Sequence, residues 1–435
     1  MDTIGVQIIV NFCHRHLQRF EIAVTWIIRL ENNMRQHYRQ GFTLVELLVI
    51  LGILSILMAM LFPAIMKVRE YSNRADCTNH LRIIGQGFNL YLAAHQSYFP
   101  TGGAWGVAPE DSINKSFVRV LNSAEQPFAA GGQNWGWMYQ LLPYVGYEGL
   151  WNLRRGPALH VPWATTKTLF YDPVADNEIR QTAVEIYSCP TRRNLRLINN
   201  LPFNIPHFTC DYAGNAGPFS FVHIDGAWDE HAQWADTTEM PASYTKKQFG
   251  MMVMGPVNQT GPDSIQNSLL HIRDVTDGLS HTLLVGEKAY NTDRYNVHQF
   301  GEQCSFCYGF SPSTLRTGGH APVRDFTASD PFVASYPFVY TSPPPINTAN
   351  VIQDFFGSAH PYSFNALFAD GSVRPIRYEI PSDPQILPNL YTDGLKDFGI
   401  QPLPSPPNPP NSLSLTLFQR LCHRSDGGRV NLIDE

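Results

Sequence analysis

The most constraining feature of this chain is a membrane-length apolar segment near its start. Residues 42–62 are almost wholly apolar, and Glu46 is the only ionisable side chain among them. A helix of about 20 apolar residues crosses the hydrocarbon core of a bilayer, so the segment predicts a membrane-spanning helix. A charged side chain at the bilayer centre costs about 2.5–3.5 kcal/mol on insertion scales, which makes Glu46 a candidate functional residue.

The residues at the start of this segment resemble a known processing signal. Residues 41–46 read Gly-Phe-Thr-Leu-Val-Glu, which is similar to the type IV prepilin motif. In that family a membrane-embedded prepilin peptidase cleaves after the Gly on the cytoplasmic side and methylates the new N-terminal Phe. The resemblance implies cleavage after Gly41, an N-methylated Phe42 as mature N-terminus, and Glu46 as the carboxylate for methylation and assembly, where it pairs with a neighbouring subunit's amine. The alternative is an ordinary signal anchor, which does not need this motif.

The segment before the motif is unusually long for a prepilin leader. Residues 1–33 alternate apolar and charged side chains and match neither a secretory signal nor a membrane span. A start at Met34 gives a short leader whose Arg35 and Arg39 stay in the cytoplasm, as the positive-inside rule expects. We interpret residues 1–41 as the leader, with residues 1–33 an upstream extension of the reading frame. The expected location is the inner membrane, with a single span and the head in the periplasm or at the cell surface.

The pilin helix is expected to continue beyond the membrane. Residues 64–98 carry apolar side chains at spacings near three and four, with charged residues between them. Pro63 is expected to kink this helix, the alternative being two separate helices. Phe99 and Pro100 predict its end. The interior positions expected are Ile65, Val68, Tyr71, Ala75, Leu81, Ile84, Phe88, Tyr91 and His95.

Composition describes the remaining domain in outline. The formal charge of −6 and pI near 6.2 give no basic surface for nucleic acid. Charged residues are 16% and aromatic residues 12%, with 32 Gly and 33 Pro. This composition favours a loop-rich exported domain that contains strands over a helical bundle.

Three later segments extend the resemblance to most of the chain. They are Asp-Tyr-Ala-Gly-Asn-Ala-Gly at 211–217, Asp-Gly-Leu-Ser-His-Thr-Leu-Leu-Val-Gly-Glu-Lys at 277–288, and residues 356–373, in which nine residues separate His360 from Asp370-Gly371. The chain resembles the planctomycete pseudopilin-like family known as domain of unknown function 1559, which has a prepilin-type N-terminus and a C-terminal His-x9-Asp-Gly signature. The resemblance covers residues 41–435, apart from a Pro-rich spacer at 402–410, and it supplies no reaction.

The resemblance implies an α+β, type IV pilin-like fold. A long kinked N-terminal helix, with its membrane half at 42–63 and its outer half at 64–99, packs on an elaborated antiparallel β-sheet head at 100–435. Asp370-Gly371 lies between strand-like runs and predicts a hairpin in which both turn residues have positive φ. His360 lies too far along an extended strand to form a local metal pair with Asp370. Asp277-Gly278 is read as another turn, and Glu287 and Lys288 as solvated charges that end a strand.

The cysteines permit a disulfide but do not identify a metal site. Cys304 and Cys307 form the only Cys-x-x-Cys, which is weak evidence for zinc without a second pair. Family members often carry cysteine at the positions of Cys77 and Cys189, so the resemblance implies a possible disulfide that would stabilise the head by about 2–4 kcal/mol. We assign no metal ligand; calcium is possible, but no acidic loop identifies its ligands.

The sequence contains no recognisable catalytic motif. It has no Gly-x-Ser-x-Gly, His-Glu-x-x-His or phosphate-binding glycine loop, so we predict neither an enzyme nor a cofactor. The expected function is a pseudopilin-like cell-envelope subunit, processed by prepilin peptidase and assembled with itself or other pseudopilins into a type II secretion or type IV pilus-like structure. The alternative is a membrane-anchored module that binds glycan or another polymer through exposed aromatic residues, and an exported hydrolase ranks third. Core packing is the competing role of Trp135, Trp137, Trp151 and Trp163.

Overall fold

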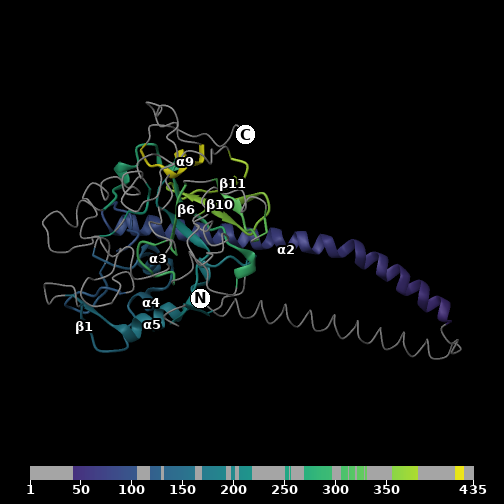
Figure 1. Cartoon of the computed structure of the whole chain (residues 1–435), viewed down its shortest axis with the longest axis horizontal. Coiled ribbons are helices and arrows are strands. Elements are labelled where there is room, and N and C mark those ends of the chain that lie inside the picture. The colour runs from purple at the N-terminus through teal and green to yellow at the C-terminus, as the bar shows by residue number, and fades with distance from the viewer. Residues whose placement is uncertain are drawn as a thin grey trace, which may run out of the picture. The chain divides into compact units, whose positions relative to one another are not determined.

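The structure is a computed structural model that describes residues 43–104, 118–128, 132–161, 169–192, 197–200, 205–217, 250–253, 255, 269–295, 305–311, 313–318, 321–327, 329–330, 355–380 and 417–425. It divides into two compact units, Met1–Val68 and Arg69–Glu435. Helix α2, Leu44–Ala94, begins in the first unit and ends in the second (Figure 1). Gly41, Phe42 and the Pro-rich spacer lie outside the described residues.

The first part of α2 has the properties of a membrane span. Thr43 caps the helix: the Glu46 backbone N–H donates to Thr43 Oγ1 at 3.3 Å, and the Glu46 carboxylate accepts from the Thr43 backbone N–H at 3.0 Å. This reciprocal pair is a capping box. The most apolar part of the helix is long enough to cross a membrane, and none of it is buried. The helix runs through Pro63 without interruption, so the alternative of two separate helices is wrong.

The second part of α2 is buried in the head from Cys77 onward. Leu81, Ile84, Phe88 and Tyr91 are buried as predicted. Four other positions expected in the interior are exposed, namely Ile65, Val68, Tyr71 and Ala75, and Tyr71 is 73% exposed. The prediction for these four positions was wrong because helical periodicity identifies a face, but not the point at which other elements begin to cover it.

The helix ends at Ala94 and not at the predicted stop near Phe99. Gln96 and Ser97 have φ values of 53° and 65°, and the Ser97 backbone N–H donates to the Leu92 carbonyl at 2.8 Å. This left-handed turn redirects the chain, so that Tyr98 forms a bridge with His271.

A five-stranded sheet forms the centre of the head. Its order is β11-β10-β6-β5-β7. The strands are β5 (Tyr212–Asn215), β6 (Leu283–Glu287), β7 (Leu315–Arg316), β10 (Ser363–Phe368) and β11 (Val373–Arg377). All neighbouring pairs are antiparallel except β5 and β7, which are parallel. The sheet therefore departs from the expected wholly antiparallel arrangement at one edge.

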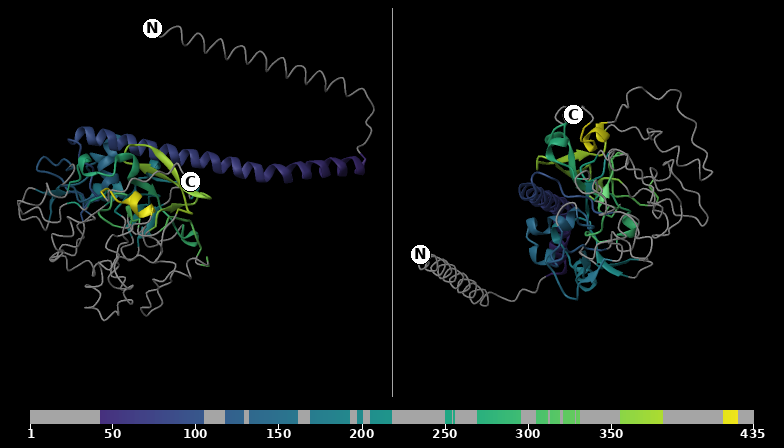
Figure 2. Two further views of the ribbon diagram at one scale, coloured as in Figure 1. Left: turned by 90° about the horizontal axis from the view of Figure 1, so that it is seen from above. Right: turned by 90° about the vertical axis from the view of Figure 1, so that its left-hand side faces the viewer.

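Both faces of the sheet pack in hydrophobic cores, one with the long purple helix α2 and the other with a short yellow helix near the C-terminus (Figure 2). On one face, Val285 and Leu367 join a core that contains Leu81 and Phe88 of α2. Gly85 permits this close packing, because a Cβ there would lie 2.8 Å from Leu367 Cδ1. On the other face, α9 (Leu417–Cys422) packs in a second core. Its members include Ala213, Leu283, Phe356, Phe364, Ala366, Phe368, Ile376, Phe418 and Leu421.

The predicted hairpin at Asp370-Gly371 joins β10 to β11, but its turn differs from the predicted type. Among the two turn residues only Gly371 has positive φ, at 85°. The Gly371 N–H donates to the Phe368 carbonyl, and the Phe368 N–H donates to Ser372, both at 2.9 Å. This is the pattern of a three-residue loop with a left-handed glycine. Asp370 instead accepts from the backbone N–H and hydroxyl of Ser372, at 2.9 and 2.6 Å.

The remaining described elements are short and surround this core. Trp135 and Trp137 are fully buried and Trp151 is partly buried, which confirms core packing at these three positions, while Trp163 lies outside the described residues. The elements are α3 (Trp137–Leu141), η2 (Leu142–Val145), α4 (Glu148–Trp151), β1 (Leu159–His160), β2 (Phe170–Tyr171), α5 (Pro173–Gln181), η3 (Glu185–Tyr187), β3 (Leu197–Asn200), β4 (Ile205–Phe208), η5 (Ile272–Asp274), η6 (Leu279–His281), η7 (Thr292–Arg294), β8 (Val323–Arg324) and β9 (Gly357–Ser358).

Candidate functional site

The predicted processing site is represented in the described residues only by Glu46. Its side chain is exposed, and one carboxylate oxygen accepts from both the backbone N–H and the hydroxyl of Thr43, the latter at 2.9 Å. The second oxygen has no hydrogen bond in this local pair. The carboxylate therefore lies at the N-terminal end of α2, where the free backbone N–H groups favour a negative charge.

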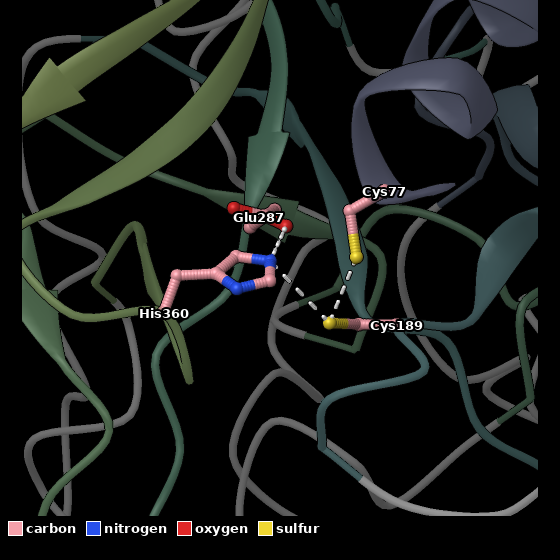
Figure 3. Close-up of side chains that lie close together, drawn as sticks. All are labelled: Cys77, Cys189, Glu287 and His360. Carbon is pink, nitrogen blue, oxygen red and sulfur yellow. Dashed lines mark hydrogen bonds and ion pairs between the residues drawn. The ribbon is translucent and has the colours of Figure 1, made fainter. Parts of the chain in front are cut away.

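A second candidate site lies inside the head, where four side chains from distant parts of the chain meet (Figure 3). They are Cys77 on α2, Cys189 after η3, Glu287 at the end of β6, and His360 after β9. All four are buried, and one sulfur, nitrogen or oxygen atom from each lies within 4.8 Å of the others. This set contains the donor types that bind transition metals.

Backbone contacts hold these side chains in place. Glu287 lies on the face of β6 that is turned toward α2, and its Oε2 accepts from the Asn365 backbone N–H at 2.7 Å. The Cys189 backbone N–H donates to Asp211 at 2.7 Å. The His360 carbonyl accepts from the Tyr378 hydroxyl at 2.9 Å. The sheet and its adjoining loops therefore position three of the four residues, and α2 supplies the fourth.

The polar atoms of the cluster are close enough to interact directly. The sulfurs of Cys77 and Cys189 are 3.0 Å apart, and His360 Nε2 lies 3.9 Å from the Cys189 sulfur and 3.3 Å from Glu287 Oε1. The other ring nitrogen of His360, Nδ1, lies 2.5 Å from Glu70 Oε1. His360 is therefore held between two carboxylates, one inside the cluster and one on α2.

These contacts alter the acidity of three groups. A hydrogen bond from Cys77 lowers the pKa of Cys189 to about 7 despite its burial. The same hydrogen bond, together with burial, raises the pKa of Cys77 above its ordinary value. Burial alone would lower the pKa of His360, but hydrogen bonds to Cys189 and Glu287 outweigh it and raise that pKa to about 11. These contacts therefore favour the charged form of His360 and the thiolate form of Cys189.

The structure brings together the two cysteines that the family resemblance singled out, but it describes both as free thiols. The disulfide between Cys77 and Cys189 thus remains a prediction. His360 and Asp370 take part in separate hydrogen-bond sets, the first in the buried cluster and the second in the hairpin turn. His360 and Asp370 thus belong to different parts of the head.

Sequence reasoning missed Glu287, and its interpretation as a solvated charge was wrong. Glu287 and Lys288 are both fully buried. Lys288 Nζ donates to the Ser313 carbonyl at 2.9 Å and lies 5.1 Å from the ring centre of Tyr290. The sequence did contain a sign that Glu287 is buried. The apolar run before it does not alternate with polar residues, which is typical of a strand covered on both faces.

Comparison with known proteins gives two matches. The family described as "Protein of unknown function (DUF1559)" matches residues 66–383. The prokaryotic N-terminal methylation motif matches residues 36–62. No curated protein and no solved structure matches the chain.

Proposed function

The chain belongs to the family described as DUF1559, and on this premise we propose that it is a structural pseudopilin of the cell envelope whose N-terminal helices assemble side by side. The matches confirm the family over residues 66–383 and the prepilin-type motif over residues 36–62; the C-terminal signature stays a prediction. The chain is pseudopilin-like, carries a prepilin-type motif, and has a helix that anchors it in a membrane. The proposal adds cleavage after Gly41, methylation of Phe42, an inner-membrane location with the head outside the cytoplasm, and assembly.

The observation that carries the proposal is the division of α2 into an uncovered apolar part and a buried part. Large apolar side chains from Leu44 to Val68 are exposed, whereas Cys77, Leu81, Ile84 and Phe88 are fully or almost fully buried. An exposed apolar surface of this length requires lipid or other apolar helices around it. One helix thus provides both the membrane anchor and a structural part of the head.

Glu46 is the group expected to join one subunit to the next. Cleavage after Gly41 would create a positively charged amine at Phe42, four residues before Glu46. An unpaired carboxylate in the hydrocarbon core is costly, and a neighbouring amine offsets that cost. A methylated terminal amine remains a cation, so the modification is compatible with this ion pair.

The described head gives no support to the alternative of an aromatic glycan-binding surface. Trp135 and Trp137 are 0% exposed, and Trp151 stacks on the buried ring of Tyr139 at 4.5 Å between ring centres. Among the described residues, these tryptophans stabilise the core and do not form a platform. We therefore propose a structural role in place of a glycan-binding one.

The test compares Glu46→Leu with Ser55→Leu, a control substitution on the same exposed helix. In wild-type cells, mass spectrometry is expected to find an N-methylated Phe42, and Gly41→Val is expected to leave the longer precursor in the membrane. Glu46→Leu is expected to insert normally but to reduce recovery of sheared or cross-linked assemblies, while Ser55→Leu assembles as wild type. Mature wild-type protein that begins at Met1 or Met34, or normal assembly of Glu46→Leu, would contradict the proposal.

A further inference from the structure

We propose that Cys77, Cys189, Glu287 and His360 bind one Zn²⁺ ion, which joins α2 to the sheet of the head. Each residue supplies one donor atom: two sulfurs, one carboxylate oxygen and the Nε2 of His360. The inference is independent of whether the subunit assembles, because it concerns only the interior of the head.

The spacing of the donor atoms is close to that of a tetrahedral site, with the two sulfurs closer together than zinc would hold them. Zinc binds sulfur at about 2.3 Å and nitrogen or oxygen at about 2.0–2.2 Å, so neighbouring donors in a tetrahedron lie roughly 3.3–3.8 Å apart. The cluster has donor separations of 3.0 Å between the sulfurs, 3.3 Å between His360 and Glu287, and 3.9 Å between His360 and Cys189. No separation exceeds 4.8 Å, so small side-chain movements complete the geometry.

The donor chemistry favours zinc over calcium or magnesium. Those hard cations take oxygen ligands, whereas two thiolates and an imidazole are the donors of a tetrahedral zinc site. Four protein ligands leave no open position for water, which is the arrangement of structural zinc sites and not of catalytic ones. The full burial of all four side chains agrees with a closed site.

The groups around the cluster are arranged as the outer shell of a metal site. A histidine that binds a metal usually donates its other ring N–H to a carboxylate, which fixes its tautomer and orientation. Glu70 is placed for this role, with Oε1 at 2.5 Å from His360 Nδ1 and Oε2 accepting from the Thr191 hydroxyl at 3.1 Å. Glu287 Oε2 is held by the Asn365 backbone N–H, which leaves Oε1 directed toward His360 Nε2.

A disulfide between Cys77 and Cys189 would use only half of this arrangement. It would join the sulfurs and leave His360 and Glu287 to form only their ion pair beside them. A zinc ion accounts for all four residues at once and replaces the protons of the two thiols. His360 then binds through Nε2 as a neutral imidazole and keeps its proton on Nδ1, facing Glu70.

The site would connect parts of the chain that are distant in sequence. Its ligands come from α2, the segment after η3, the end of β6 and the segment after β9. Because such a site does not exist in the unfolded chain, metal binding contributes directly to folding. The zinc ion would thus fasten the outer part of the pilin helix to the sheet.

The first experiment uses the wild-type full-length protein, purified in detergent without chelators. Elemental analysis is expected to find one zinc per chain, and zinc-edge X-ray absorption to find two sulfur neighbours at about 2.3 Å and two nitrogen or oxygen neighbours at about 2.0 Å. Replacement by cobalt is expected to give thiolate-to-cobalt charge-transfer absorption. Metal-free protein with a mapped Cys77–Cys189 disulfide, or bound zinc without sulfur neighbours, overturns the proposal.

The second experiment assigns the ligands. Cys189→Ser and His360→Gln are expected to lower zinc content at least tenfold after dialysis, whereas Cys422→Ser and Cys307→Ser retain it. The two controls are also buried cysteines, and Cys307 belongs to the Cys-x-x-Cys that is the competing site. Loss of zinc in Cys307→Ser, or its retention in both cluster variants, overturns the assignment. If the cluster variants do not fold, two other measurements still test the assignment: the number of sulfur neighbours of zinc in the wild-type protein, and the zinc content of the two control variants.

Discussion

Substitutions in the Asp370-Gly371 turn test whether these two residues have a structural role. Gly371 has a φ of 85°, a conformation that costs a residue with a Cβ about 1–2 kcal/mol. A Cβ at this position would lie 3.3 Å from the flexible side chain of Asn89, so backbone strain and not crowding dominates the cost. The branched side chain of valine adds to the strain, and we expect Gly371→Val to destabilise the head by about 2–3 kcal/mol.

Substitutions of the neighbouring Asp370 test the hydrogen bonds of the turn separately from its backbone strain. Asp370→Ala removes the acceptor for the Ser372 backbone N–H and hydroxyl, for a loss of about 1–2 kcal/mol. The ion pair with Arg374 adds little, because both side chains are about one-third exposed. Asp370→Asn keeps an oxygen at the same position and is the matched control, with an expected change below about 0.5 kcal/mol.

Urea unfolding of the full-length protein in detergent, followed by the fluorescence of the buried tryptophans, measures these differences. The expected order of destabilisation is Gly371→Val, then Asp370→Ala, then Asp370→Asn, and membrane insertion is unchanged in all three. A Gly371→Val protein as stable as wild type would refute the strain argument. An Asp370→Ala protein of normal stability that fails to assemble would show that Asp370 acts in binding and not in the turn.

Two further predictions concern the head. Phe88→Ala is expected to lower the free energy of unfolding in urea by about 3–5 kcal/mol, because Phe88 is 1% exposed in the core. The control Leu90→Ala, at a position 55% exposed on the same helix, should change that free energy by less than about 0.5 kcal/mol. Equal effects of the two substitutions would show that α2 is not part of the core. Burial opposes ionisation of Asp172, but hydrogen bonds from the backbone N–H groups of Arg155 and Ala175 prevail and lower its pKa to about 2. Since the folded-state pKa lies below the unfolded value of about 3.9, Asp172 contributes about 2 kcal/mol of stability that is complete above about pH 5 and is lost as the pH falls toward 2. The stability gap between wild type and Asp172→Asn should therefore narrow between pH 5 and pH 2.5, and a constant gap would contradict this reasoning.

The sequence by itself determined the features that depend on local patterns. A membrane-spanning helix follows from the length and apolarity of residues 42–62, because the bilayer sets a fixed length for any segment that crosses it. The Asp-Gly pair predicted the β10–β11 hairpin, because few residues adopt the backbone conformation that a tight turn needs. The apolar spacing on α2 identified its buried face from Leu81 to Tyr91.

Only the tertiary structure decided how residues far apart in sequence meet. Glu287 looked solvated because a charge at the end of a strand normally faces water, yet the sheet is covered on both faces and places it beside Cys77 and His360. Glu70 had no signal of its own, since a glutamate on a helix is usually a surface residue. The cluster depends on the packing of α2 against the sheet. The apolar periodicity of a helix or a strand shows which face is buried, but not where one element lies on another.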